Sequence, residues 1–220
     1  MCLNNWGGID HKVLEFHEYV NLFSGKSGSG KSTVMDAIQV ILYGSFSPSF
    51  LNKAADDAKN RRSVLSYLRG EQKDGSANRK DCDFCSVIAL EIEDTGTHII
   101  TCIGIAFEVR KSDSEIKKFV YFSHSGKMPE SEYLTEQGVC YSNQEIKKLV
   151  SARTKSDDNR GKGEVNRIYG SKEAYLGTLY DVILGYIDQN RFITMEKSAI
   201  ALKMTNGTGQ FIRDYMFPKN

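Results

Sequence analysis

The sequence predicts an α/β protein built around a phosphate-binding loop (P-loop). Residues 25–32, Gly-Lys-Ser-Gly-Ser-Gly-Lys-Ser, fit the pattern G-x-x-x-x-G-K-[ST]. An apolar run at 20–23 precedes this loop and a helix-like run at 31–43 follows it, which is the context that such a loop requires. Further along, apolar and polar side chains alternate between residues 83 and 125 and predict antiparallel strands.

The residue types in the loop suit a nucleoside triphosphate and Mg²⁺. Glycines allow the backbone to turn tightly and to point N–H groups inward, where the N-terminus of the next helix adds its positive dipole end. Lys31 is expected to reach the β- and γ-phosphates, Ser32 to bind Mg²⁺, and Thr33 to supply a neighbouring hydroxyl. The predicted ATP-binding residues of the loop are Gly25, Lys26, Ser27, Gly28, Ser29, Gly30, Lys31, Ser32 and Thr33. The alternative is a Gly/Ser-rich turn at the start of a helix.

Composition predicts a soluble cytoplasmic protein with no membrane partner. The 220 residues include 29 basic and 28 acidic side chains, so any DNA contact must come from a local patch. No apolar run approaches the ~20 residues of a membrane span, and the first ten residues lack the regions of a signal peptide. Five cysteines fit reduced thiols better than a disulfide framework. Cys82 and Cys85 form a CxxC without a second pair, so they are either zinc ligands or small hydrophobic residues.

Residues 1–70 are predicted to form the lobe that carries the P-loop. We expect strands at 2–6, 13–16 and 20–23, with a Gly-Gly turn at 7–8. Apolar residues at 34, 38, 41 and 42 predict one helical stripe, which Gly44 ends. Trp6 either stacks on a nucleotide base or packs in the core, and the core is favoured.

A locally basic region follows at 59–80. Residues 61–68 predict a helix and 71–80 a flexible connection. The basic residues of the region are Lys59, Arg61, Arg62, Arg69, Lys73, Arg79 and Lys80. They form either a solvated surface or a contact with nucleic acid or a γ-phosphate, and the sequence leaves both open.

The rest of the chain is predicted as an antiparallel β-subdomain at 81–125 and a helical segment at 126–220. The β-subdomain has strands around 88–92, 99–109 and 119–123, with a hairpin turn at 94–97. Helices are expected at 129–137, at 144–153 and across 175–187, with a mobile charged loop at 151–163.

Hydrolysis needs more than a P-loop. It requires a second acidic residue at a strand end to hold Mg²⁺ and a group that orients water. The nearest match to an apolar strand ending in Asp-Glu is 182–188, which ends at Asp188 and has a helical rather than a strand period. The sequence also contains no Leu-Ser-Gly-Gly stretch, so it supplies about half of an ATPase site.

The region around the loop resembles a known family. Residues 25–39, ending in Met-Asp-Ala-Ile-Gln, are similar to the P-loop and following helix of the ABC-type heads of structural-maintenance-of-chromosomes (SMC) proteins. Shorter stretches at 3–7, 52–54, 67–70 and 211–213 resemble the branch that includes MukB and the Wadjet subunit JetC. Ser27 stands where these heads often have Asn.

The resemblance implies the N-terminal half of an SMC-like head. In such proteins a coiled coil follows this half, and a C-terminal half-head brings the signature motif and the Walker B strand. By resemblance, Gln210 is the Q-loop residue that contacts Mg²⁺ and the attacking water, with Gln189 as the alternative, and Arg61 or Arg62 is the arginine-loop residue. The implied partners are the C-terminal half-head, a second head in a homodimer, kleisin-type and accessory subunits, and DNA.

The function expected from these observations is ATP binding with Mg²⁺, and hydrolysis only when two complete heads close. Closure would drive DNA translocation or loop extrusion, in plasmid defence or chromosome organisation, and these 220 residues alone are expected to be inactive. One alternative is a self-contained P-loop kinase or GTPase, although Asn52-Lys53 is followed by Ala54-Ala55 and not by the x-Asp of a GTPase motif. The other is a non-catalytic interaction module gated by nucleotide.

Overall fold

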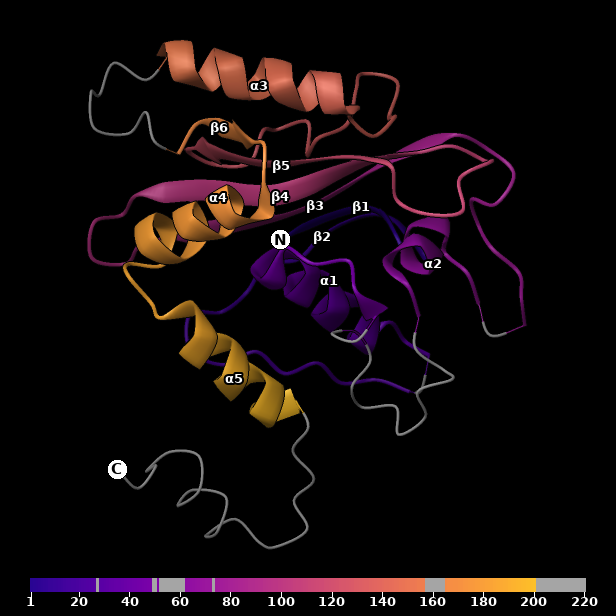
Figure 1. Ribbon diagram of the computed structural model, residues 1–220, viewed down its shortest axis with the longest axis horizontal. Helices are drawn as coiled ribbons and strands as arrows, with labels where there is room; N and C mark the ends of the chain where they lie inside the picture. Colours follow the sequence, from indigo (N-terminus) through magenta and orange to yellow (C-terminus); the bar gives the residue numbers. More distant parts are fainter. Residues whose placement is uncertain (27, 49–50, 52–61, 73, 157–164, 201–220) are drawn as a thin grey trace, which may run out of the picture.

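The computed structural model places a six-stranded antiparallel sheet between two helical layers (Figure 1). It describes residues 1–220 except 27, 49–50, 52–61, 73, 157–164 and 201–220. The strands run in the order β2-β1-β3-β4-β5-β6. Their bounds are β1 Cys2–Trp6, β2 Ile9–Val13, β3 Phe84–Glu93, β4 Ile100–Val109, β5 Lys118–Ser125 and β6 Arg167–Tyr169.

Helices cover both faces of this sheet. α3 (Asn143–Ser156) lies on one face, whereas α1 (Lys31–Tyr43), α2 (Val64–Arg69) and α4 (Lys172–Gly177) lie on the other (Figure 1). A π-helical segment, Thr178–Ile183, continues α4, and α5 (Gln189–Ile200) follows it. No helix among the described residues is long and apolar enough to cross a membrane.

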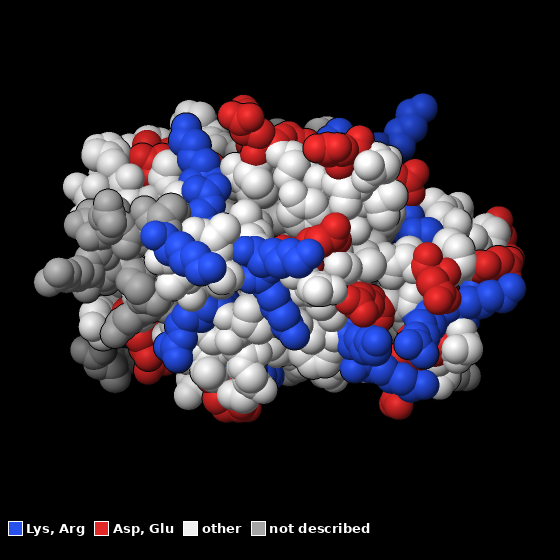
Figure 2. Space-filling view, turned by 90° about the horizontal axis from the view of Figure 1, so that it is seen from above, with Lys and Arg blue, Asp and Glu red and all other residues white. Residues whose placement is uncertain are grey.

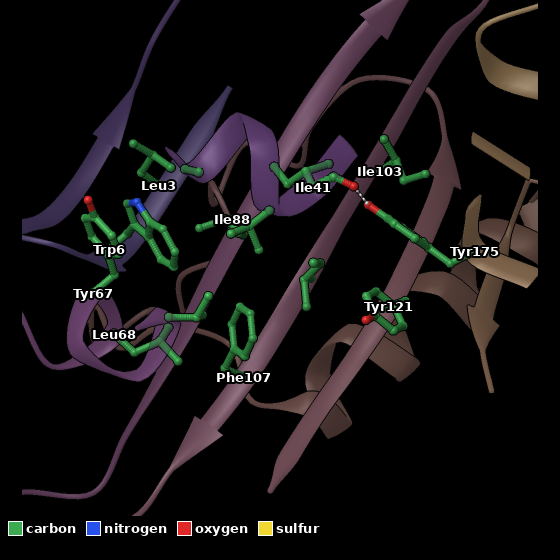
Figure 3. Close-up of a cluster of buried hydrophobic side chains, with 14 of the residues drawn as sticks. Leu3, Trp6, Ile41, Tyr67, Leu68, Ile88, Ile103, Phe107, Tyr121 and Tyr175 are labelled. Atoms are coloured by element: carbon green, nitrogen blue, oxygen red, sulfur yellow. Dashed lines mark hydrogen bonds between the residues drawn. The ribbon is translucent and has the colours of Figure 1, made fainter. Parts of the chain in front are cut away.

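Strand alternation divides the interior into two cores. On β4, Ile103 and Phe107 point toward α1, as Figure 3 shows, and belong to the larger core. Their neighbour Ala106 points the other way and packs in the smaller core with Ile146 of α3. Each face of the sheet is therefore covered by its own core. Both faces of β4 are apolar because both are buried.

The sequence prediction of an antiparallel meander is confirmed. β3 pairs with β4 along all ten residues, and β4 pairs with β5 from Thr101 to Glu108. Asp94 accepts hydrogen bonds from the backbone N–H groups of Gly96 and Thr97, which forms the expected turn. The meander belongs to a wider sheet, because β1 also pairs with β3. The division of the chain at 70, 81 and 126 stays a prediction.

The C-terminus of α1 is bound by tyrosine hydroxyl groups. The last carbonyl groups of a helix have no partner within the helix, so burying them requires outside donors. Gly44 ends α1 with a φ of 53°, as the sequence predicted. Three hydroxyl groups supply the donors: Tyr175 to the carbonyl of Ile41 at 2.9 Å, Tyr180 to Leu42 at 3.0 Å and Tyr121 to Gly44 at 2.6 Å (the first is drawn in Figure 3).

Four of the expected elements are wrong in whole or in part. Strands were expected at 13–16 and 20–23, but β2 ends at Val13 and residues 14–25 form no strand. The expected helix at 129–137 is a series of turns closed by a bridge between Leu134 and Cys140, and Glu132 and Tyr133 have positive φ, which a helix excludes. The loop expected at 151–163 is helical as far as Ser156, and its residues 157–163 lie outside the described residues.

The helical patterns are otherwise confirmed in type. The pattern at 61–68 is α2, which begins only at Val64 because Ser63 caps it through the N–H of Ser66. Of the pattern at 175–187, residues 175–183 are helical, in α4 and the π-helical segment, whereas 184–187 are not. Residues 182–188 form no strand.

Two of the four described basic side chains at 59–80, Arg69 and Arg79, are bound within the protein. Arg79 is 6% exposed, donates to the carbonyl of Leu68 at 2.9 Å and pairs with Asp10 at 2.8 Å. Arg69 donates to the carbonyl of Asp113 at 2.5 Å. The prediction of a flexible connection at 71–80 is therefore wrong near its end, because Arg79 binds Asp10 of β2.

We expect Gly104→Ala to destabilise the sheet. A Cβ at this position of β4 would lie 2.4 Å from the carbonyl oxygen of Ile88 in β3, so the two strands would have to separate. The expected loss is about 1–3 kcal/mol in the free energy of unfolding, measured by urea denaturation. Gly8→Ala is the control, because nothing lies within 4 Å of a Cβ there. Equal stabilities of the two variants would contradict this account of the strand spacing.

We expect acid to weaken the core beneath α3 through His124. Burial lowers its pKa from 6.5 to about 4, and its ring bonds Tyr133 Oη at 2.9 Å. Because the unfolded chain takes up the proton near pH 6.5 and the folded chain does not, stability falls as the pH drops from 6.5 toward 4. The loss is about 2 kcal/mol by about pH 5. Urea denaturation across this range should show a smaller pH dependence in His124→Gln, whereas exposed His98→Gln should retain the parent slope.

Candidate nucleotide-binding site

The loop between residue 25 and α1 closes through backbone conformations that favour glycine. Gly25, Gly28 and Gly30 have φ values of 153°, 85° and 88°. A Cβ on Gly25 would lie 2.7 Å from Ser29 Oγ, so the first glycine is also needed for the close approach of the two sides of the loop. The Gly positions of the motif are thus explained by geometry.

The loop leads into the N-terminus of α1, which is suited to an anion. Gly30 is the N-cap and offers no side-chain hydrogen bond, and the first turn contains no acidic residue. The first N–H groups of a helix have no intrahelical acceptor, and the helix dipole adds positive potential there. An anion such as phosphate would bind these N–H groups directly.

The Lys31 ammonium lies across the loop. Its Nζ donates to the carbonyl of Gly25 at 2.6 Å, to the carbonyl of Lys26 at 3.0 Å and to Ser29 Oγ at 3.2 Å. These three acceptors hold a positive charge against the loop that precedes α1. The arrangement can neutralise a phosphate chain, which is the role predicted for Lys31.

The hydroxyl residues after Lys31 have different surroundings. Ser32 is exposed, so its hydroxyl is accessible to a metal ion or solvent. Thr33 packs its methyl group against Gly7, because a Cβ on Gly7 would lie 2.5 Å from Thr33 Cγ2. The glycine of the first turn thus lets β1 and β2 approach the P-loop helix closely.

Other predicted site residues are less fully placed. Ser27, Arg61 and Gln210 lie outside the described residues. Arg62 is described, and its guanidinium lies 5.6 Å from the centre of the Tyr67 ring. Gln189 is the first residue of α5.

A polar clamp, formed by Trp6, Tyr67 and Asp36, fixes the start of α1. Trp6 Nε1 donates to the carbonyl of Thr33 at 2.8 Å, and its ring stacks on Tyr67 with centroids 5.0 Å apart. Tyr67 Oη in turn donates to the buried carboxylate of Asp36, in the second turn of α1. Figure 3 shows the stacked rings of Trp6 and Tyr67. The clamp joins β1 and α2 to the helix that carries the P-loop.

Sequence reasoning placed Trp6 in the core, which the structure confirms, but assigned no role to Tyr67 or Asp36. A signal for Asp36 was present in the sequence. It lies four residues before Val40 and seven before Tyr43, both buried, so it shares the apolar side of α1. A carboxylate at such a position requires a buried donor.

α5 binds α1 through a second buried polar contact. Gln39 is 3% exposed, and its Nε2 donates to Glu196 Oε1 at 3.2 Å. Tyr180 and Phe192 pack edge to face next to this contact, with centroids 5.7 Å apart. The helix behind the loop is therefore in contact with the sheet on one side and with α5 on another.

The segment that leads into the loop is apolar and exposed. Tyr19, Val20 and Leu22 are 79%, 77% and 90% exposed, and they form no strand with any described residue. Isolated exposed apolar residues are common, but four within residues 19–23, directly before the loop, are not. This pre-loop segment, residues 16–23, is the largest departure from the expected strand, loop and helix.

The described residues contain no cluster of metal-binding side chains. No group of three or more His, Cys, Asp or Glu side chains is placed to hold a metal ion in the described part of the chain. Cys82 is exposed, whereas burial raises the pKa of Cys85 to about 11, which keeps its thiol protonated.

Comparison with known families agrees with the loop geometry. Residues 1–58 match the family model of the P-loop containing region of AAA domain. The match includes β1, β2, the loop and α1, and it supports a P-loop NTPase. No curated protein matches the chain.

We expect Tyr67→Phe to destabilise the clamp. The change retains the ring on Trp6 but removes the hydroxyl that donates to buried Asp36. The free energy of unfolding should fall by about 1–3 kcal/mol, as measured by urea denaturation. Tyr186→Phe is the matched control, because that side chain is 86% exposed and should be close to neutral. A loss in the control as large as in Tyr67→Phe would contradict the assignment.

Proposed function

We propose that this chain is the ATP- and Mg²⁺-binding N-terminal half of an SMC-like ATPase head of the MukB and JetC type. In this proposal the head hydrolyses ATP only after a C-terminal half-head completes it and a second head closes over the nucleotide. Closure then drives DNA translocation or loop extrusion, in plasmid defence or chromosome organisation. The remaining partners are kleisin-type and accessory subunits, and the protein acts in the cytoplasm.

One observation carries the proposal: a well-formed P-loop follows an apolar segment that has no strand partner among the described residues. The loop and α1 supply the phosphate site, yet Tyr19, Val20 and Leu22 are exposed directly before it. An extended apolar segment is stabilised when another strand pairs with it and covers its side chains. A C-terminal half-head that adds strands beside residues 16–23 would satisfy this requirement and would bring the acidic strand that the sequence lacks.

The roles of the chain's own residues follow from their positions. Lys31 exchanges its loop acceptors for β- and γ-phosphate oxygens, while the N–H groups of the loop and the first turn of α1 bind the phosphate chain. Ser32 offers its exposed hydroxyl to Mg²⁺, which stabilises charge on the phosphates when bound. Gln210, or Gln189, orients water, and Arg61 or Arg62 approaches the phosphates from the segment before α2.

We expect Lys31→Ala to weaken Mg·ATP binding by at least about tenfold, because the loop loses the charge that neutralises the phosphates. Isothermal titration of the 220-residue chain measures the change. Lys12→Ala on β2 is the matched control and should bind as the parent does. The parent chain should show negligible ATP turnover, and turnover should rise when a C-terminal half-head is co-purified with it.

Three results would contradict the proposal. Robust hydrolysis by the 220-residue chain, abolished by Lys31→Ala, would favour a self-contained P-loop enzyme, and transfer of phosphate to an acceptor would identify a kinase. Equal ATP binding by the parent and Lys31→Ala would remove the nucleotide site itself. Binding without hydrolysis even in the complete head would favour a nucleotide-gated interaction module.

A further inference from the structure

α3 is a firmly anchored helix on the sheet face opposite the P-loop. Ser142 and Glu145 form a capping box, in which Ser142 N donates to Glu145 Oε2 at 2.7 Å and Glu145 N donates to Ser142 Oγ at 3.4 Å. Ile146 and Val150 are buried against the sheet. The helix therefore presents a fixed set of side chains on its outer side.

The outer side of α3 carries lysines and no acidic residue. Its exposed residues between the cap and Lys155 are Gln144, Lys147, Lys148, Ser151, Ala152, Thr154 and Lys155. At a rise of about 1.5 Å per residue, the lysine row from 147 to 155 spans about 12 Å. Figure 2 looks down on this face, where Lys and Arg side chains cross the centre, with some acidic side chains beside them and others toward the edges.

The acidic residues around α3 are bound to other groups. Glu145 belongs to the cap. Glu108 accepts from the N–H of Asn143 at 3.0 Å, and Glu91 accepts from the N–H of Met128 at 2.6 Å. Among the described residues, the three lysines of the row take part in no ion pair. All three lysines lie on the exposed side of the helix, in contrast to Arg79, which is buried and paired with Asp10.

We propose that the lysine row of α3, Lys147, Lys148 and Lys155, binds the phosphate backbone of duplex DNA without regard to sequence. Lysine is a mobile point charge that neutralises phosphates and releases counterions. The small side chains of Ser151 and Ala152 between the lysines leave room for a backbone to approach.

A protein partner is less well suited to this surface. Protein interfaces depend on buried aromatic, arginine or large apolar anchors. The exposed side of α3 has none of these, since its apolar residues Ile146 and Val150 are used in the core. A regular array of phosphates needs no such anchor, because charge and spacing supply the affinity.

The lysine row is separate from the nucleotide site. α1 packs in the larger core and α3 in the smaller core, with the sheet between them. The lysines therefore cannot reach phosphates bound at Lys31. The biological role of this DNA contact rests on the proposed function. The inference deepens that function by assigning the DNA contact to Lys147, Lys148 and Lys155.

The test is DNA binding by the 220-residue chain with Lys147, Lys148 and Lys155 all changed to Gln. Fluorescence anisotropy with a labelled random-sequence duplex, between about 50 and 200 mM salt, should show affinity reduced by at least about tenfold. The slope of log K against log salt should become shallower by about 0.9 for each phosphate that the variant no longer neutralises. The control is Lys12, Lys80 and Lys111 changed to Gln, which removes the same charge from other parts of the surface.

Several outcomes would overturn the inference: no DNA binding by the parent, equally weakened binding in the two triple variants, or tighter binding of polyglutamate or duplex RNA than of duplex DNA. Mg·ATP titration of the α3 variant separates the two proposals, because it should equal the parent. If Lys31→Ala left ATP binding intact while the α3 variant no longer bound DNA, the proposed function would fail and the α3 contact would stand.

Discussion

The position of α1 depends on hydrogen bonds at both of its ends. A helix that is buried on a sheet leaves polar groups at its termini, and each one that lacks a partner destabilises the fold. At the C-terminus, hydroxyl groups from β5, α4 and the π-helical segment bind the carbonyl groups of Ile41, Leu42 and Gly44. Near the N-terminus, Trp6 and Tyr67 provide donors to Thr33 and Asp36. The N–H groups of the first turn have no acceptor within the helix and can bind an anion.

This arrangement explains how a short loop is held in a defined geometry. The shape of the loop depends on where α1 begins, on the glycine conformations before it and on the bonds of Lys31. Because β1, α2, α4 and β5 all contribute to the position of α1, elements distant in the sequence fix the P-loop. The sheet is thus the support for the site although no described strand pairs with the segment before the loop.

The sequence predicted well those features that depend on local pattern. The period of the apolar residues identified α1 and the meander, and Gly44 and residues 94–97 were identified by their turn chemistry. It failed for features that depend on contacts with residues distant in the sequence. Residues 20–23 have strand composition, but a strand forms only with a hydrogen-bonding partner, and none is present among the described residues. Arg79 looked like a surface charge because only the fold brings Asp10 and the carbonyl of Leu68 to it.

The same distinction applies to the functional surfaces. A P-loop is contiguous in the sequence, so its residues were found, whereas the clamp joins residues 6, 36 and 67 through tertiary packing and was missed. Charge behaves similarly. The basic residues at 59–80 were the more obvious cluster, yet Arg69 and Arg79 are bound within the protein. The lysines of α3 are fewer and less clustered in the sequence, but they point outward. This is because Ile146 and Val150 fix which side of the helix is buried. The direction of a side chain, more than local charge density, decides which cations are available to a partner.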